Sequence, residues 1–214
     1  MDYVIDIQCC LDNKDKIVPK EVAILSLKGD HMAHYIIIPP YNANKLSDKA
    51  RNQNNWLDKN KHGISWHDGF ISKKSLVENL QELSRQAGCV YVRGREKSSI
   101  LQELMSCVII NLEDDEKCPS FQNLPASNKY CIFHSLKFCP LKYTCALNNA
   151  ARLKDWISQE DYISKQKQEK KETQLQQQHT QDLEYEFRLP DAVTAIINDE
   201  QFGDIAAYFE NQES

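Results

Sequence analysis

Two cysteines and a histidine near the end of the folded part of the chain offer the clearest chemistry in this sequence. Cys131 and His134 have two residues between them, and Cys145 follows after ten more, at the start of an expected helix. Thiolates and imidazole nitrogens are the ligands that tetrahedral zinc prefers, and a carboxylate is tolerated beside them. This spacing provides three of four ligands for a structural zinc site. The alternative is that these are ordinary buried thiols beside a histidine.

Two other cysteines compete for a place in such a site. Cys118 and Cys139 are each followed by proline, which favours an extended loop over the start of a helix. The vicinal pair Cys9–Cys10 is expected to be core thiols. The eight cysteines occur without an N-terminal secretory pattern, so we expect reduced thiols or metal ligands instead of a disulfide framework.

Composition and charge limit the classes of protein that the chain can belong to. Its 214 residues allow one sizeable core with an appendage, and 41% hydrophobic and 27% charged residues are near globular values. No run of 18 apolar residues occurs, so we expect no membrane span, and we expect the protein in the cytoplasm or the nucleus. No small-molecule substrate is indicated.

The charge is distributed unevenly and divides the chain. Residues 165–214 contain five Lys/Arg against eleven Asp/Glu, whereas the preceding residues are nearly neutral. A Gln-rich stretch without an apolar face separates these parts. We therefore expect a domain at 1–158, a Gln/Lys-rich linker at 159–186 and an acidic amphipathic tail at 187–214. The tail has apolar residues at helical spacing, from Val193 to Phe209, and is predicted to dock onto the body or onto a protein partner.

The first 158 residues alternate between strand-like and helix-like segments. Apolar runs predict strands at 3–9, 21–27, 34–38, 89–92 and 107–112. Leucines at helical spacing predict a helix over 72–83, and further helices are expected at 96–105 and 145–157. Residues 54–56 and 62–66 are expected to be ordered loops at the sheet edge. The order predicts an α/β fold, with antiparallel strands first and α/β crossovers after, in a mixed sheet flanked by helices.

Several landmarks in this order resemble the DnaQ-like 3′–5′ exonucleases of the RNase H-like fold. Those enzymes have Asp-x-Glu on the first strand, a His-Gly-Ile segment in mid-chain and His-x-Ala-Leu-x-Asp-Ala on the last helix. Here Asp6 matches the first acid, but Gln8 replaces the Glu, Thr144 the His and Asn149 the last Asp. One carboxylate with two amides cannot balance two divalent metal ions, so we expect no hydrolysis by that mechanism.

The same stretches resemble more closely the Maelstrom domain of the animal piRNA pathway, across roughly residues 3–158. The resemblance rests on Val18-Pro-Lys-Glu21-Val followed by an apolar strand, on a His-containing strand ending at Pro39, and on Val90-Tyr-Val-Arg93-Gly-Arg95-Glu-Lys97. Cys131, His134 and Cys145-Ala-Leu close the pattern, and we expect no HMG box before it. In that family zinc is held by Glu-Cys-His-Cys, and the Glu matches Glu21. The resemblance thus implies a Zn²⁺ site formed by Glu21, Cys131, His134 and Cys145.

The resemblance also implies a function, which we state as an expectation. It implies a zinc-stabilised, catalytically degenerate exonuclease-like domain that binds single-stranded RNA, a protein partner or both, in piRNA-directed silencing of transposons. Arg93, Arg95 and Lys97 are the candidate RNA-binding residues, because basic side chains bind phosphates. Two alternatives stay open. One is a single-strand ribonuclease that acts without the exonuclease acids, and the other is an interaction protein encoded by a transposon or virus.

Overall fold

The computed structural model describes residues 1–115, 118–127, 129, 131–137 and 143–159, together with the isolated positions Gln168 and Thr180. The chain divides into two units, Met1–Gln159 and Glu160–Ser214. Apart from the two isolated positions, the second unit is outside the described residues. The linker expected at 159–186 and the acidic helix expected at 187–214 therefore stay predictions.

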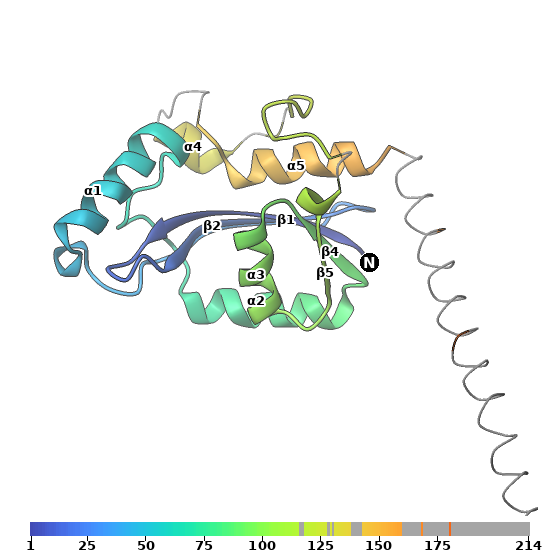
Figure 1. Cartoon of the computed structure of the whole chain (residues 1–214), viewed down its shortest axis with the longest axis horizontal. Coiled ribbons are helices and arrows are strands. Elements are labelled where there is room, and N and C mark those ends of the chain that lie inside the picture. The colour runs from blue at the N-terminus through green and yellow to red at the C-terminus, as the bar shows by residue number, and fades with distance from the viewer. Residues whose placement is uncertain are drawn as a thin grey trace, which may run out of the picture. The chain divides into compact units, whose positions relative to one another are not determined.

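A five-stranded mixed sheet forms the centre of the first unit (Figure 1). Its strands are β1 (Tyr3–Leu11), β2 (Ile17–Ser26), β3 (Met32–Ile36), β4 (Cys89–Val92) and β5 (Val108–Asn111). They lie in the order β3-β2-β1-β4-β5. The first three strands pair antiparallel, while β4 pairs parallel with both β1 and β5. This confirms the predicted α/β class and the predicted sequence of antiparallel strands followed by crossovers.

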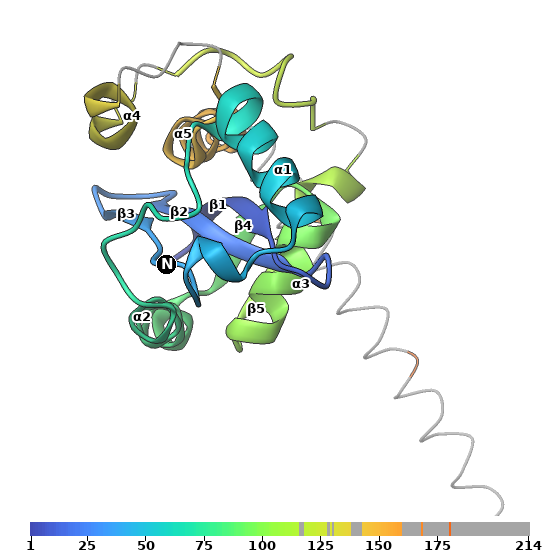
Figure 2. The same ribbon diagram turned by 90° about the vertical axis from the view of Figure 1, so that its left-hand side faces the viewer.

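Helices cover both faces of this sheet (Figure 2). The α-helices are α1 (Asp48–Leu57), α2 (Lys73–Gln86), α3 (Arg95–Leu104), α4 (Ile132–Leu136) and α5 (Ala146–Ile157), and the short helical turns are η1 (Ala43–Lys45), η2 (Asp58–His62) and η3 (Leu112–Asp114). In both views α2 and α3 lie on one side of the sheet, and α1, α4 and α5 lie on the other. The main core is on the α2 side, where Leu76, Leu80 and Leu83 pack against apolar residues of the strands.

The helix α1 corrects one expectation, because Asn54, Asn55 and Trp56 were expected in a loop and lie inside it. The helix has no apolar stripe that could have revealed it. It begins at a Ser47 side chain that caps the Ala50 N–H, and it is fixed to the sheet by hydrogen bonds. The Asn54 side chain both accepts from the Leu11 N–H and donates to the Leu11 carbonyl, each at 2.8 Å.

A buried lysine fixes the segment that follows η2. Lys20 is completely buried, and its Nζ donates to the carbonyl oxygens of Ile37, Trp66 and Asp68 at 2.5–2.8 Å. An ammonium group has three donors, so this geometry satisfies it fully. Gly69 follows with a φ of +148°, and a Cβ there would come within 2.4 Å of the Ile38 nitrogen. Residues 63–69 thus follow the sheet closely although they form no strand.

Among the described residues, no helix combines the length and the apolar character needed to cross a lipid bilayer.

Candidate metal centre and the neighbouring Asp6 site

Strand alternation places several polar side chains on the face of the sheet that α5 covers. Asp6 and Gln8 are two residues apart on β1, so they share a face, while Ile5 and Ile7 point into the core on the α2 side. In the antiparallel register Gln8 is opposite Glu21 of β2. Two polar sites therefore lie next to each other under α5, one at Glu21 and one at Asp6.

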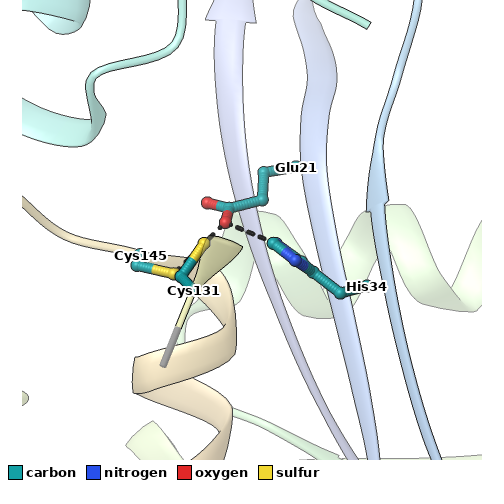
Figure 3. A group of neighbouring side chains, drawn as sticks. All are labelled: Glu21, His34, Cys131 and Cys145. Carbon is teal, nitrogen blue, oxygen red and sulfur yellow. Dashed lines mark hydrogen bonds and ion pairs between the residues drawn. The ribbon is translucent and has the colours of Figure 1, made fainter. Parts of the chain in front are cut away.

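The first site gathers Glu21, His34, Cys131 and Cys145, whose side chains point toward one another (Figure 3). One ligand atom from each residue lies within 4.8 Å of the others. Glu21 Oε1 is 2.7 Å from His34 Nε2 and 3.3 Å from Cys145 Sγ. Glu21 is fully buried in β2, next to the buried Lys20, and burial is costly for a carboxylate without compensating partners. This donor set can hold a metal ion.

His134 reaches the same cluster from α4. Its Nδ1 is 3.1 Å from Cys131 Sγ and 3.8 Å from Glu21 Oε1. Its Nε2 donates to the His62 carbonyl oxygen at 2.6 Å, which leaves the Nδ1 lone pair directed at the cluster. A hydrogen bond at the far nitrogen is how proteins fix the tautomer and orientation of a ligating histidine. The structure therefore groups three of the four predicted residues, Glu21, Cys131 and Cys145, with His34. The fourth, His134, lies beside this group in contact with Cys131, so His34 and His134 are both candidate ligands.

Two helix N-termini supply the cysteines. Cys131 precedes α4 and Cys145 precedes α5, each with extended backbone geometry. The first N–H of α5, from Ala146, donates to Glu21 Oε2 at 2.9 Å, so the carboxylate is held by the helix that also carries a thiol. A hydrogen bond from the Cys145 thiol and one from His134 lower the pKa of Cys131. A thiol whose pKa is lowered in this way is a better ligand for a soft divalent metal.

His34 was not predicted as a ligand, although the strand that carries it was. It lies opposite Ala23 in the β2–β3 register, one diagonal step from Glu21 on the same face of the sheet. The signal in the sequence was a histidine in an apolar strand next to the strand with the buried glutamate. Assigning it required the register between the two strands, which the sequence does not specify.

Two further cysteines, Cys118 and Cys139, were considered as alternative ligands for the metal site. Cys118 is buried away from the cluster, with its Sγ 3.7 Å from the Pro119 carbonyl oxygen. Cys139 lies outside the described residues.

The second site is centred on Asp6, one helical turn further along α5. Asp6 is fully buried, and its Oδ2 accepts from Asn149 Nδ2 at 3.0 Å and from Gln8 Nε2 at 3.2 Å. Its Oδ1 is 2.5 Å from Lys97 Nζ. Burial raises the pKa of Asp6, and the ion pair with Lys97 and the hydrogen bond from Asn149 oppose part of that rise. Asp6, Gln8 and Asn149, which align with exonuclease motif positions, thus lie together. Lys97 places an ammonium group beside the Asp6 carboxylate.

Lys97 reaches Asp6 because of where β4 ends. Tyr3 and Val4 of β1 pair with Val90 and Tyr91 of β4, so the chain leaves β4 beside the middle of β1. Gly94 then turns the backbone at a φ of +123°, a conformation that favours glycine, and α3 begins. The third residue of that helix is Lys97. The remaining motif residue, Thr144, donates its Oγ1–H and its N–H to the carbonyl oxygen of Lys61.

The predicted RNA-binding residues have different surroundings. Lys97 is committed to Asp6, and Arg93 donates to the Pro119 carbonyl oxygen and lies 3.5 Å from Glu113. Both cations also lie over the ring of Phe121. Arg95 is exposed. The charges of Arg93 and Lys97 are therefore engaged within the protein.

No model of a known protein family matches this chain, and a search of curated proteins finds no matching sequence.

Proposed function

We propose that this chain contains a zinc-stabilised RNase H-like domain that has lost two-metal hydrolysis and binds RNA. The resemblance to the Maelstrom domain extends the proposal to RNA-directed silencing of transposons, with the acidic tail as a docking segment for a protein partner. The mixed sheet, with antiparallel strands first and parallel strands after, supports the RNase H-like part of the proposal.

The zinc part is supported by the donor set of two cysteines, two histidines and a buried glutamate. Sulfur and nitrogen donors at a buried point suit Zn²⁺ better than Mg²⁺ or Ca²⁺, which prefer oxygen. The ligands come from β2, β3 and the starts of α4 and α5, so the ion would tie both helices to the sheet. Its role would be structural.

One observation supports the proposed loss of hydrolysis, namely the ion pair between Lys97 and Asp6. A two-metal site needs several carboxylates around divalent cations that lie close together. Here Lys97 puts a single positive charge 2.5 Å from the one remaining acid, and Gln8 and Asn149 contribute neutral amides. An ammonium group this close to Asp6 supports the loss of metal binding at that carboxylate.

Three measurements test this proposal. Elemental analysis of protein purified without chelators should find one zinc per chain, and a protein free of zinc would contradict the structural role. His34→Ala and His134→Ala, each assayed for zinc affinity, should identify which imidazole is the ligand, because the ligand variant loses far more affinity. Labelled single-stranded RNA incubated with Mg²⁺ or Mn²⁺ should stay intact. A ladder of 3′-shortened products that disappears in Asp6→Ala would refute the loss of hydrolysis.

A further inference from the structure

A pocket of about 530 Å³ opens beside the first turns of α5. One wall is formed by α5, from Cys145 to Arg152, and a second by the end of η2, including Lys61. The third wall is the segment 121–127, including Phe121. The pocket borders both sites described above, since Cys145 belongs to the candidate metal centre and Asn149 holds Asp6. Its volume is in the range of pockets that bind small organic ligands.

The lining is positive and rich in neutral hydrogen-bonding groups. Among the described residues that line it, Lys61 and Arg152 are cationic and none is acidic. This composition is unusual for a chain with a net charge of −5, because carboxylates outnumber cations overall. Carboxamide side chains, including Asn148 and Asn149, supply most of the remaining polar groups. Positive charge without acids favours an anionic ligand, and carboxamides favour one with hydrogen-bonding edges.

The pocket walls are held in place by their own hydrogen bonds. Arg152 donates from Nε to the Pro125 carbonyl oxygen at 2.8 Å and from Nη2 to the Leu124 carbonyl oxygen, so it fixes the third wall while its charge remains at the pocket. Tyr143 donates to the Lys59 carbonyl oxygen at 2.7 Å. Two aromatic rings, Phe121 and Tyr143, therefore line a preorganised site.

Asn148 provides an independent sign of a ligand. Its Oδ1 is buried and has no hydrogen-bond donor within the described part of the chain. A buried carbonyl oxygen without a donor is energetically unfavourable, so such atoms are rare in folded proteins. Asn148 lines the pocket, so a rotation of its side chain toward the cavity would let a ligand N–H group supply the missing donor. The exocyclic amino group of a nucleobase is such a donor.

We propose that this pocket binds one nucleotide of single-stranded RNA. Lys61 and Arg152 contact its phosphate, Asn148 accepts from the amino group of the base, and the base stacks on an aromatic side chain of the pocket. The inference deepens the proposed RNA-binding function and rests on it. It moves the contact from the 93–97 segment, where two of the three cations lie close to carboxylates, to a pocket whose cations, Lys61 and Arg152, form no ion pair with the described residues.

Fluorescence anisotropy with the full-length, zinc-loaded chain and a labelled oligoadenylate RNA decamer tests this site. Lys61→Gln should weaken binding several-fold and should reduce the slope of log affinity against log salt by about 0.7, the value for one phosphate contact on a single strand. Asn148→Asp keeps an acceptor for the amino group of the base but adds a negative charge to the pocket that holds the phosphate, so it should weaken binding several-fold. An acid in the first turn of a helix is compatible with the helix dipole, so α5 should still form.

Lys59→Gln is the matched control. Lys59 is an exposed lysine on the same turn as Lys61, it does not line the pocket, and its loss changes the net charge equally. It should bind the decamer within about 2-fold of the unmodified chain. If Asn148→Asp loses zinc or fails to fold, Lys61→Gln decides, because its side chain is exposed.

Two failures are distinguishable. If the unmodified chain binds the decamer and both pocket variants bind it equally well, RNA binds elsewhere, so the pocket inference is wrong while the proposed function stands. If the unmodified chain shows no binding up to about 100 µM at low salt, the RNA-binding function is wrong. Titration of the chain with adenosine 5′-monophosphate, followed by NMR of the asparagine side-chain amides, then decides the pocket. Shifts that Lys61→Gln weakens would support a nucleotide site, and no shifts would refute it.

Discussion

Replacing Lys97 by methionine should destabilise the fold more than any other single change of a partly exposed charge described above. The change removes the ammonium from Asp6 Oδ1 and leaves a completely buried carboxylate. Removing one partner of a buried pair costs about 3–5 kcal/mol. Two circumstances place the effect near the lower end of that range. Asn149 and Gln8 still donate to Oδ2, and the Lys97 side chain is 22% exposed.

We therefore expect Lys97→Met to lower the free energy of unfolding by about 3 kcal/mol, a fall in the thermal midpoint of about 6–12 °C for a domain of this size. Urea unfolding of the zinc-loaded chain, followed by circular dichroism, measures the loss. The double variant Asp6→Asn/Lys97→Met should recover about 2 kcal/mol, because a buried amide needs no counter-charge.

Lys49→Met provides the control for loss of a lysine from an ion pair. Lys49 pairs with Asp15 at 2.7 Å, but the two side chains are 67% and 56% exposed. Exposed pairs of this kind contribute at most about 1 kcal/mol. The reasoning would be refuted if Lys97→Met cost no more than Lys49→Met, or if adding Asp6→Asn restored no stability.

Three further predictions concern the metal, a buried lysine and the tail. Chelation of the metal at neutral pH should lower the thermal midpoint by at least about 10 °C, because structural zinc contributes folding free energy directly. Calorimetry of the holo and the chelated protein measures this difference. An unchanged midpoint would exclude a structural ion. Burial lowers the pKa of Lys20 from 10.5 to about 8. Between these values the unfolded chain binds more protons than the folded one, so this group makes stability rise with pH. Urea unfolding at about pH 7.5 and about pH 9.5 should show that rise in the unmodified chain and its absence in Lys20→Met. A chain ending at residue 164 should stay folded and keep its zinc by circular dichroism and elemental analysis; loss of folding would show that the acidic tail belongs to the core.

The sequence was informative wherever one segment carried its own pattern. The leucines of α2 lie at helical spacing, and the helix forms where they predict it. Cys131, His134 and Cys145 are close enough in the sequence to suggest one metal site, whereas Glu21 was assigned through the family resemblance. The structure places Glu21 with Cys131 and Cys145, and it places His134 next to Cys131.

Features that depend on pairing between distant segments could not be predicted. His34 joins the cluster through the register of β2 and β3. Lys97 meets Asp6 across a separation of 91 residues, and no local pattern distinguishes it from a solvated lysine. The helix α1 was missed because the amide of Asn54, rather than an apolar stripe, fixes it to β1.

The segment from His62 to Gly69 has a consequence for hydrogen exchange. Lys20 of β2 donates to two of its carbonyl oxygens, and His134 donates to the carbonyl oxygen of His62. Lys137 donates to the Gly63 carbonyl oxygen and to the Asp68 carboxylate. His134 and Lys137 both belong to α4 or its C-terminal cap, so the segment is bound on one side by the sheet and on the other by the helix at the metal centre. This irregular stretch should open as one cooperative unit with α4, and its amide protons should exchange slowly in the metal-loaded chain and quickly once the metal is gone.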